Sequence, residues 1–182
     1  MVGTTPQSCI LSSSLLHAVL EDYVRLLLQL ENIVPDTFYQ SSAFPLAFRG
    51  SMAALTLIQS DLVFAALDLF RNIVNNDCFS TPAPDPKDTL LAAAIKTVIE
   101  KEGFEFVGCL LNGLVGDFPD DSTSSVVSIF RSLATLFPSE LLAWLPPVLQ
   151  HLPVTSAPNE SKQQLLMDVS TYVYTLPSDH PD

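Results

Sequence analysis

Apolar residues recur every three or four positions through most of this chain, and short proline-rich or polar turns separate the apolar segments. This spacing gathers apolar side chains on one face of an α-helix, whereas a half-buried strand would show strict alternation. Residues 14–33 illustrate the pattern, and Pro35 ends it because a proline disfavours helical geometry in the residue before it. The chain is therefore predicted to be all-α. The apolar positions of this first segment are Leu15, Leu16, Val19, Leu20, Tyr23, Val24, Leu27, Leu28 and Leu30.

Prolines, glycines and polar clusters divide the chain into about seven predicted helices. Pro45 predicts a break near Phe44 in the second helix, because proline lacks the N–H of the helical hydrogen bond and clashes with the preceding turn. Gly103 predicts a bend or an interruption in the fourth helix. Pro146 and Pro147 predict a kink in the sixth. The predicted helices span residues 14–33, 37–58, 60 to 75–76, 88–115, 124–137, 138–151 and 160–176.

The helices fall into consecutive pairs over residues 14–58, 60–116 and 122–151, with one unpaired helix at the end. A pair spacing of about 40 residues is typical of HEAT/ARM-type α-solenoids, in which each pair buries its apolar face against the next. A closed helical bundle is the competing all-α architecture. The 48% share of hydrophobic residues favours the open array. We predict one solenoid segment over residues 14–176, between disordered residues 1–13 and 177–182.

The two end helices of such an array have a neighbour on one side only. We therefore expect the first and the seventh helix each to expose an apolar face, and exposed faces of this kind promote association. The isolated chain is predicted to self-associate or to be marginally stable.

The charge balance excludes several classes of partner. The 182 residues include 8 basic and 20 acidic side chains, a formal net charge of −12. Nucleic acids and anionic membrane surfaces attract basic faces, so we expect neither as a direct partner. No apolar run approaches the length of a membrane span. Cys9, Cys78 and Cys109 lie far apart without a CxxC pair, which favours free thiols and an intracellular, soluble protein.

The sequence offers no constellation for catalysis. His17, His151 and His180 are widely separated, and none has a His, Cys or Asp at metal-ligand spacing. A nucleophile elbow, a phosphate-binding loop and a dinucleotide fingerprint are all missing. We therefore expect a protein that is not an enzyme and that uses no metal or cofactor.

Acidic residues concentrate between Asp77 and Asp121, where nine carboxylates accompany three lysines. This segment is either a solvated surface or a docking patch for an Arg- or Lys-rich partner, through electrostatic steering and charge-paired hydrogen bonds. Trp144 is either an exposed anchor or, as we favour, a side chain packed between adjacent helices. The candidate partner-binding residues, which we call the acidic patch, are Glu100, Glu102, Glu105, Asp117, Asp120 and Asp121.

The order of the segments resembles the C-terminal part of the importin-β-like nuclear transport receptors, in the group of transportin-SR, the mRNA transport regulators and importin thirteen. The resemblance runs from about residue 14 to residue 173, and it depends on the ordered succession of segments rather than on one motif. The segments are 20–26 (LEDYVRL), 34–39 (VPDTFY), 67–74 (LDLFRNIV), 129–131 (IFR), 137–145 (FPSELLAWL) and 149–153 (LQHLP).

The resemblance implies stacked HEAT helix pairs and a role in nuclear import, with shuttling between cytoplasm and nucleus. Receptors of this kind carry basic cargo such as SR-type splicing factors or other RNA-binding proteins, and they release it when Ran-GTP binds. We find no counterpart of their N-terminal Ran-binding region, so we expect this chain to be a fragment of a longer receptor, a truncated paralogue or an isolated C-terminal module. Ran-GTP is expected to act only through the N-terminal part of a full receptor. The family's arginine-rich cargo helix is not reproduced by Arg25, Arg49, Arg71 and Arg131.

A second hypothesis, from a different class of protein, is a stand-alone helical scaffold or adaptor for protein–protein interaction. Partner identity separates the two: RS-rich or basic RNA-binding partners support the import receptor, whereas cytoskeletal or signalling partners support the adaptor.

Overall fold

In the computed structural model the described residues, 7–57, 59–80, 85–155 and 157–175, are helices joined by short turns, with no strand among them. The all-α prediction is confirmed for this part of the chain. Of the predicted disordered segments 1–13 and 177–182, residues 1–6 and 177–182 lie outside the described part. Residues 7–13, however, are helical, because the first helix begins at Gln7 and not at residue 14.

Eight α-helices and two 3-10 turns make up the described residues, one α-helix more than predicted. The predicted break near Phe44 is confirmed, since the segment expected as one helix forms α2 and α3. The elements are α1 (Gln7–Ile33), α2 (Pro35–Gln40), α3 (Phe44–Leu55), α4 (Ser60–Val74), η1 (Asp77–Phe79), α5 (Pro86–Val115), η2 (Asp120–Ser122), α6 (Thr123–Leu136), α7 (Pro138–His151) and α8 (Asn159–Thr175).

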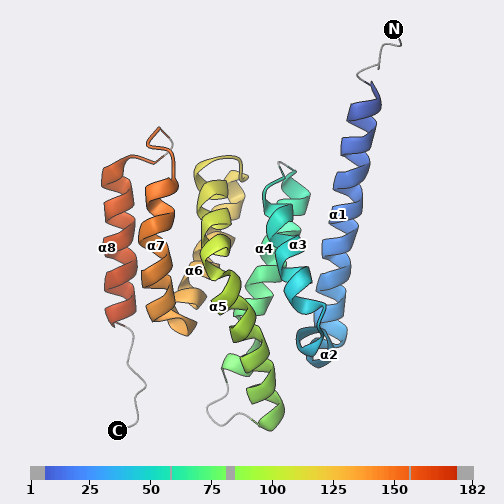
Figure 1. Cartoon of the computed structure of the whole chain (residues 1–182), viewed down its shortest axis with the longest axis horizontal. Coiled ribbons are helices and arrows are strands. Elements are labelled where there is room, and N and C mark those ends of the chain that lie inside the picture. Colours follow the sequence, from blue (N-terminus) through green and yellow to red (C-terminus); the bar gives the residue numbers. More distant parts are fainter. Residues whose placement is uncertain (1–6, 58, 81–84, 156, 176–182) are drawn as a thin grey trace.

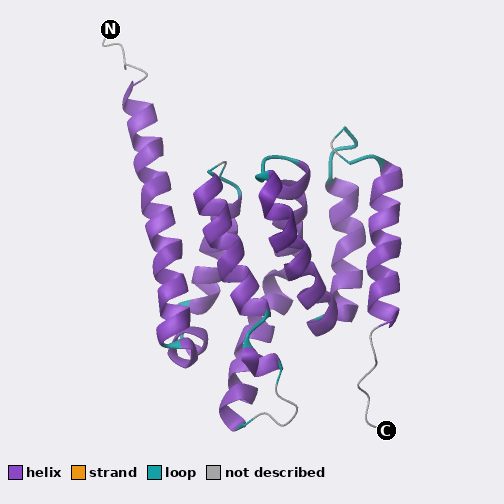
Figure 2. Cartoon of the chain, turned by 180° about the vertical axis from the view of Figure 1, so that it is seen from behind, coloured by secondary structure: helices purple, strands orange, loops and turns teal. Residues whose placement is uncertain are grey.

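The helices pack in two layers, and the chain passes from one layer to the other at nearly every turn. In one layer α1 packs on α4, α4 on α6 and α6 on α8, while in the other α3 packs on α5 and α5 on α7. Figure 1 shows α1 and α8 at opposite ends of the array, and the view from behind in Figure 2 shows the same order. The arrangement is compatible with a helical solenoid.

Two predictions about α5 need correction: the residue at which it starts, and the alternative that Gly103 interrupts it. The long helix α5 starts at Pro86 rather than at residue 88, with the Asp85 carboxylate accepting hydrogen bonds from the backbone N–H of Lys87 (2.6 Å) and Asp88 (3.2 Å). Proline suits this first position because its missing N–H has no helical acceptor there. At Gly103 the helix is not interrupted.

Gly103 serves a packing role instead. The indole of Trp144, on α7, lies against the backbone of α5 at this residue, where a Cβ would stand only 2.6 Å from Cζ2 of the ring. The expectation that Trp144 packs between adjacent helices is therefore confirmed. The glycine costs α5 some intrinsic helix stability but allows α5 and α7 to approach closely.

An aromatic cluster forms the centre of the core and joins α2, α3, α4 and α5. Neighbouring rings in it lie between 4.5 and 6.3 Å apart, centroid to centroid, mostly in edge-to-face or tilted pairs. Such pairs add stability beyond the burial of their apolar area. The members are Phe38, Tyr39, Phe44, Phe48, Phe70 and Phe106.

The end helices do present apolar side chains to solvent. On α8 no described residue is buried, and Met167 and Tyr174 are 65% and 80% exposed. The outward face of α1 is richer still, and Figure 1 shows α1 extending beyond the helices beside it. Its exposed large apolar residues are Leu15, Leu16, Val19, Leu26, Leu30 and Ile33.

Candidate functional site

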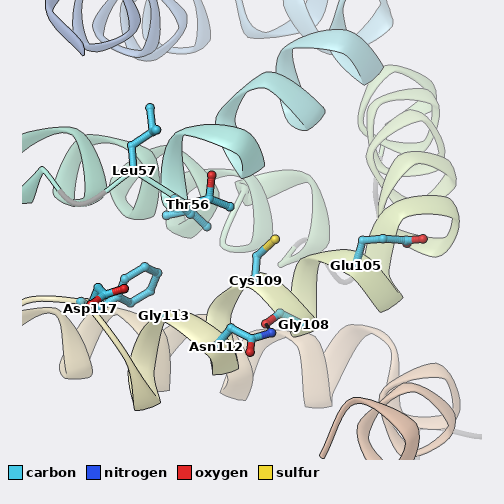
Figure 3. Close-up of a pocket in the computed structure, with 10 residues that line it drawn as sticks. Thr56, Leu57, Glu105, Gly108, Cys109, Asn112, Gly113 and Asp117 are labelled. Carbon is cyan, nitrogen blue, oxygen red and sulfur yellow. Dashed lines mark hydrogen bonds between the residues drawn. The ribbon is translucent and has the colours of Figure 1, made fainter. Parts of the chain in front are cut away.

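A surface groove lies between the C-terminal end of α3 and the second half of α5, and the turn after α5 closes one side of it (Figure 3). We call it the α3–α5 groove; its volume is about 520 Å³. It is the place where two members of the acidic patch meet an apolar surface. The lining residues are Leu55, Thr56, Leu57, Glu105, Gly108, Cys109, Asn112, Gly113, Asp117 and Phe118.

The turn after α5 builds one wall of the groove by folding back on the helix. The backbone N–H groups of Gly116 (3.2 Å) and Phe118 (2.9 Å) both donate to the carbonyl oxygen of Gly113. The Phe118 ring then covers Gly113 so closely that a Cβ there would lie 2.5 Å from Cδ1 of the ring. Gly113 is therefore required for this wall, and Asp117 is carried to the rim beside it.

The opposite wall comes from the end of α3. The Thr56 hydroxyl donates to the carbonyl oxygen of Ala53 (2.7 Å), and the Leu57 N–H donates to that of Ala54 (3.2 Å). These bonds end the helix and place Thr56 and Leu57 among the residues that line the groove. On the floor, a Cβ at Gly108 would meet no atom within 4 Å, so this part of α5 is open.

The groove is negative in charge. Glu105 and Asp117 are both exposed, and none of the lining residues that the structure describes is basic. Figure 3 shows the Cys109 side chain pointing from α5 toward the α3 side. Burial and, to a smaller extent, the charge of Glu105 raise the pKa of the Cys109 thiol. The thiol is therefore protonated at neutral pH, and the groove has the chemistry of a binding surface for cations rather than of a nucleophilic site.

The other members of the acidic patch are placed differently. Glu102 is only 9% exposed, and its Oε1 lies 3.8 Å from Nε of Arg49 on α3. The inclusion of Glu102 in a surface patch is therefore wrong: it forms an ion pair between two helices. Glu100 is exposed on α5, and Asp120 and Asp121 are exposed in η2, but none of the three lines the groove.

Sequence reasoning missed the apolar part of this site. Leu55 and Leu57 lie far from the acidic segment in sequence, and no local signal connects them with it. By itself, Gly113 predicts only a weak point in the helix. A glycine followed five residues later by Phe118 is compatible with a ring packed on the helix end, although the sequence alone does not require it.

No group of three or more His, Cys, Asp or Glu side chains that could hold a metal ion occurs in the described part of the chain. His17 lies on α1 and His151 at the end of α7, whereas His180 is outside the described residues. Within the same described ranges, no helix is both long enough and apolar enough to cross a bilayer.

Comparison of this chain with models of known protein families and with curated proteins gave no match.

Proposed function

We propose that this chain is a non-catalytic segment of a HEAT-type helical solenoid that binds a basic protein segment in the α3–α5 groove. The two-layered helix packing, with α1 and α8 at opposite ends, supports the solenoid. The observation that carries the binding function is the groove itself. It combines the carboxylates of Glu105 and Asp117 with an apolar lining and has no basic residue among its described members.

The binding mode follows from these side chains. Arginine or lysine heads of the partner donate charge-assisted hydrogen bonds to Glu105 and Asp117, while apolar atoms of the partner pack on Leu57 and Phe118. The formal net charge of −12 accelerates the encounter with a basic partner by electrostatic steering. No chemical step is involved.

In cells, the proposed role is that of an importin-β-like nuclear transport receptor, of which this chain is the C-terminal part. The cargo would be basic, such as RS-rich or other RNA-binding proteins, and the receptor would shuttle between cytoplasm and nucleus. Ran-GTP would act through another part of the receptor, so the isolated chain should not bind Ran. The succession of segments that resembles these receptors and the acidic groove support this proposal.

A peptide titration tests the groove. A fluorescent peptide of six Arg-Ser repeats is titrated with the full chain and followed by fluorescence anisotropy at low and physiological salt. The double variant Glu105→Gln/Asp117→Asn should weaken binding several-fold, because an ion pair to a solvent-exposed carboxylate contributes about 0.2–1 kcal/mol. The same peptide with phosphorylated serines should bind more weakly, because its charge is reversed.

A matched control removes the same amount of charge elsewhere. Asp36 on α2 and Glu160 on α8 are both exposed and line none of the described grooves, so Asp36→Asn/Glu160→Gln should keep nearly the original affinity. If both double variants weaken binding equally, the peptide responds to net charge alone and the groove is not its site.

The stand-alone adaptor is the second candidate function. An immunoblot of the native protein with an antibody against residues 14–58 separates the two. A band several times heavier than 19.8 kDa, with basic RNA-binding proteins co-precipitating, supports the receptor. A band at that mass, with cytoskeletal or signalling partners, favours the adaptor.

A further inference from the structure

A second hollow lies on the other layer of the molecule, between α6 and α8, with the end of α5 as its base. We call it the α6–α8 groove; its volume is about 320 Å³. Its surface is almost wholly apolar, with one basic and one acidic residue. The lining residues are Leu111, Leu114, Val126, Val127, Phe130, Arg131, Ala134, Leu165, Asp168, Val169 and Tyr172.

The apolar lining is accessible to a partner. Leu114, Val127 and Tyr172 are 37%, 41% and 40% exposed, although each carries a large apolar side chain. One wall is α8, none of whose described residues is buried. Exposed apolar residues that gather in one hollow are typical of interaction sites, whereas single ones scattered over a surface need no explanation.

Arg131 gives this groove its charge. The other three arginines pair with carboxylates of the chain: Arg25 with Glu21, Arg49 with Glu102 and Arg71 with Asp68. Within the described residues Arg131 forms no ion pair, although the chain carries 20 acidic side chains. Its guanidinium is therefore available to a carboxylate from outside.

The acidic residue of the lining, Asp168 on α8, does not fill this role. Its Oδ1 accepts a hydrogen bond from Nε2 of Gln164 at 2.7 Å, and it forms no ion pair with Arg131. Arg131 also borders a polar hollow of about 400 Å³ that contains Asn75, Ser132 and Thr135. It thus lies at the junction of an apolar and a polar surface, where a ligand with both kinds of group would pair with it.

We propose that the α6–α8 groove is a docking site for a short acidic–apolar peptide segment of a protein partner. Two apolar side chains of the segment occupy the groove, and a neighbouring Asp or Glu carboxylate accepts hydrogen bonds from the Arg131 guanidinium. The volume lies at the lower end of the range for ligand sites, which suits two side chains rather than a whole helix. The required charge is opposite to that of the partner proposed for the α3–α5 groove, so the two sites are independent.

A protein segment fits this surface better than a nucleic acid does. A chain of net charge −12 repels a polyanion along its whole length, whereas one carboxylate beside two apolar side chains adds little repulsion. The planar guanidinium also suits bidentate pairing with a carboxylate.

An NMR titration with two matched peptides tests the site. The acidic probe is acetyl-Ser-Glu-Leu-Leu-Glu-Ser-amide, and the basic probe has lysine in place of both glutamates. The methyl signals of Leu114, Val127 and Leu165 in the full chain should shift and saturate with the acidic probe and remain unchanged with the basic one. Arg131→Glu should weaken binding of the acidic probe at least tenfold and should bind the basic probe instead.

Two variants serve as controls for charge and for the apolar lining. Lys101→Glu makes the same change of charge on α5, away from the groove, and should leave the affinity for the acidic probe nearly unchanged. Val127→Ser keeps Arg131 but removes an accessible apolar side chain, and should weaken binding several-fold. Circular dichroism confirms the fold of each variant, and Arg131→Gln replaces Arg131→Glu if the latter does not fold.

The proposal is overturned if the acidic probe leaves these methyl signals unchanged at millimolar concentration. It is also overturned if Arg131→Glu binds the acidic probe as well as the unaltered chain does. Equal binding of the acidic and the basic probe would mean a merely apolar contact and would equally contradict it.

Discussion

The ring of Trp144 on α7 occupies the space that a side chain at Gly103 on α5 would need. A Cβ built on Gly103 lies 2.6 Å from Cζ2 of the ring. This contact brings two helices of the same layer together, because α5 packs directly on α7. Gly103 lowers the intrinsic stability of the α5 helix, and the packing of the Trp144 ring against it compensates for that loss.

The substitution Gly103→Ala should therefore destabilise the protein. The added methyl group forces the indole or the helix to move, which costs about 1–3 kcal/mol in a packed region. The free energy of unfolding from urea titrations followed by circular dichroism measures the effect. Gly108→Ala, on the same helix, is the control, since a Cβ there meets no atom within 4 Å. It should stabilise the protein by about 0.5–1 kcal/mol. Opposite signs for the two variants are the expected result, and equal effects would contradict it.

A buried carboxylate fixes α1 to α2 and α4. Glu31 is 8% exposed, and its two oxygens accept hydrogen bonds from the hydroxyl of Tyr39 (3.2 Å) and from Nδ2 of Asn72 (3.0 Å). Asn72→Ala removes one donor from a buried charge and should cost about 1–3 kcal/mol. The free energy of unfolding is the measurement. Asn32→Ala is the control, because this exposed amide donates only to the carbonyl oxygen of Leu28 in its own helix. An equally large loss in the control would mean that the network contributes nothing specific.

The same network makes stability depend on pH in the alkaline range. Burial, and then the nearby charge of Glu31, raise the pKa of the Tyr39 hydroxyl far above its ordinary value of 10.0. Above that value the unfolded chain releases this proton and the folded chain keeps it. The contribution is therefore fully present below pH 10 and is lost as the pH rises further.

Tyr39→Phe isolates this contribution. Relative to the variant, the free energy of unfolding of the unaltered chain should fall as the pH rises through 10, with a slope that approaches about 1.4 kcal/mol per pH unit. Urea titrations between about pH 8 and about pH 11 measure the two slopes. The buried thiol of Cys78, with its pKa raised to about 11 from 9.0, contributes equally to both proteins and cancels in the difference. Identical slopes would contradict the prediction.

The outward face of α1 should make the isolated chain self-associate. Leu16 and Val19 are 54% and 56% exposed on one part of this helix. Replacing both with lysine should shift the chain toward monomer, because apolar contact is lost and charge repulsion is added. Sedimentation velocity over a range of concentrations measures the association. Gln29→Lys adds charge to an already polar, exposed position of α1 and should change little. A chain that is monomeric at every concentration before any substitution would contradict the prediction.

Local patterns predicted most helix boundaries. The third helix, predicted to start at Ser60 and to end at Asn75–Asn76, agrees with α4 (Ser60–Val74) to within one or two residues, because its apolar spacing and its flanking residues point to nearly the same limits. The break at Phe44 also follows from one local cause, the proline after it. Gly103 shows the limit of such reasoning: the sequence indicated a weak point in the helix, but the ring that packs on it belongs to a helix about 40 residues later.

The sequence by itself determined that this chain is helical and acidic, because helix periodicity and charge are properties of neighbouring residues and of composition. Only the tertiary structure decided which carboxylates face solvent. Glu102 pairs with Arg49, whereas Glu105, one turn further along α5, lines the groove with Asp117. Likewise, Arg131 differs from the other arginines through its position on α6, where it lines the α6–α8 groove without an ion pair among the described residues. Burial and pairing depend on contacts between residues far apart in the chain, and no local pattern specifies those contacts.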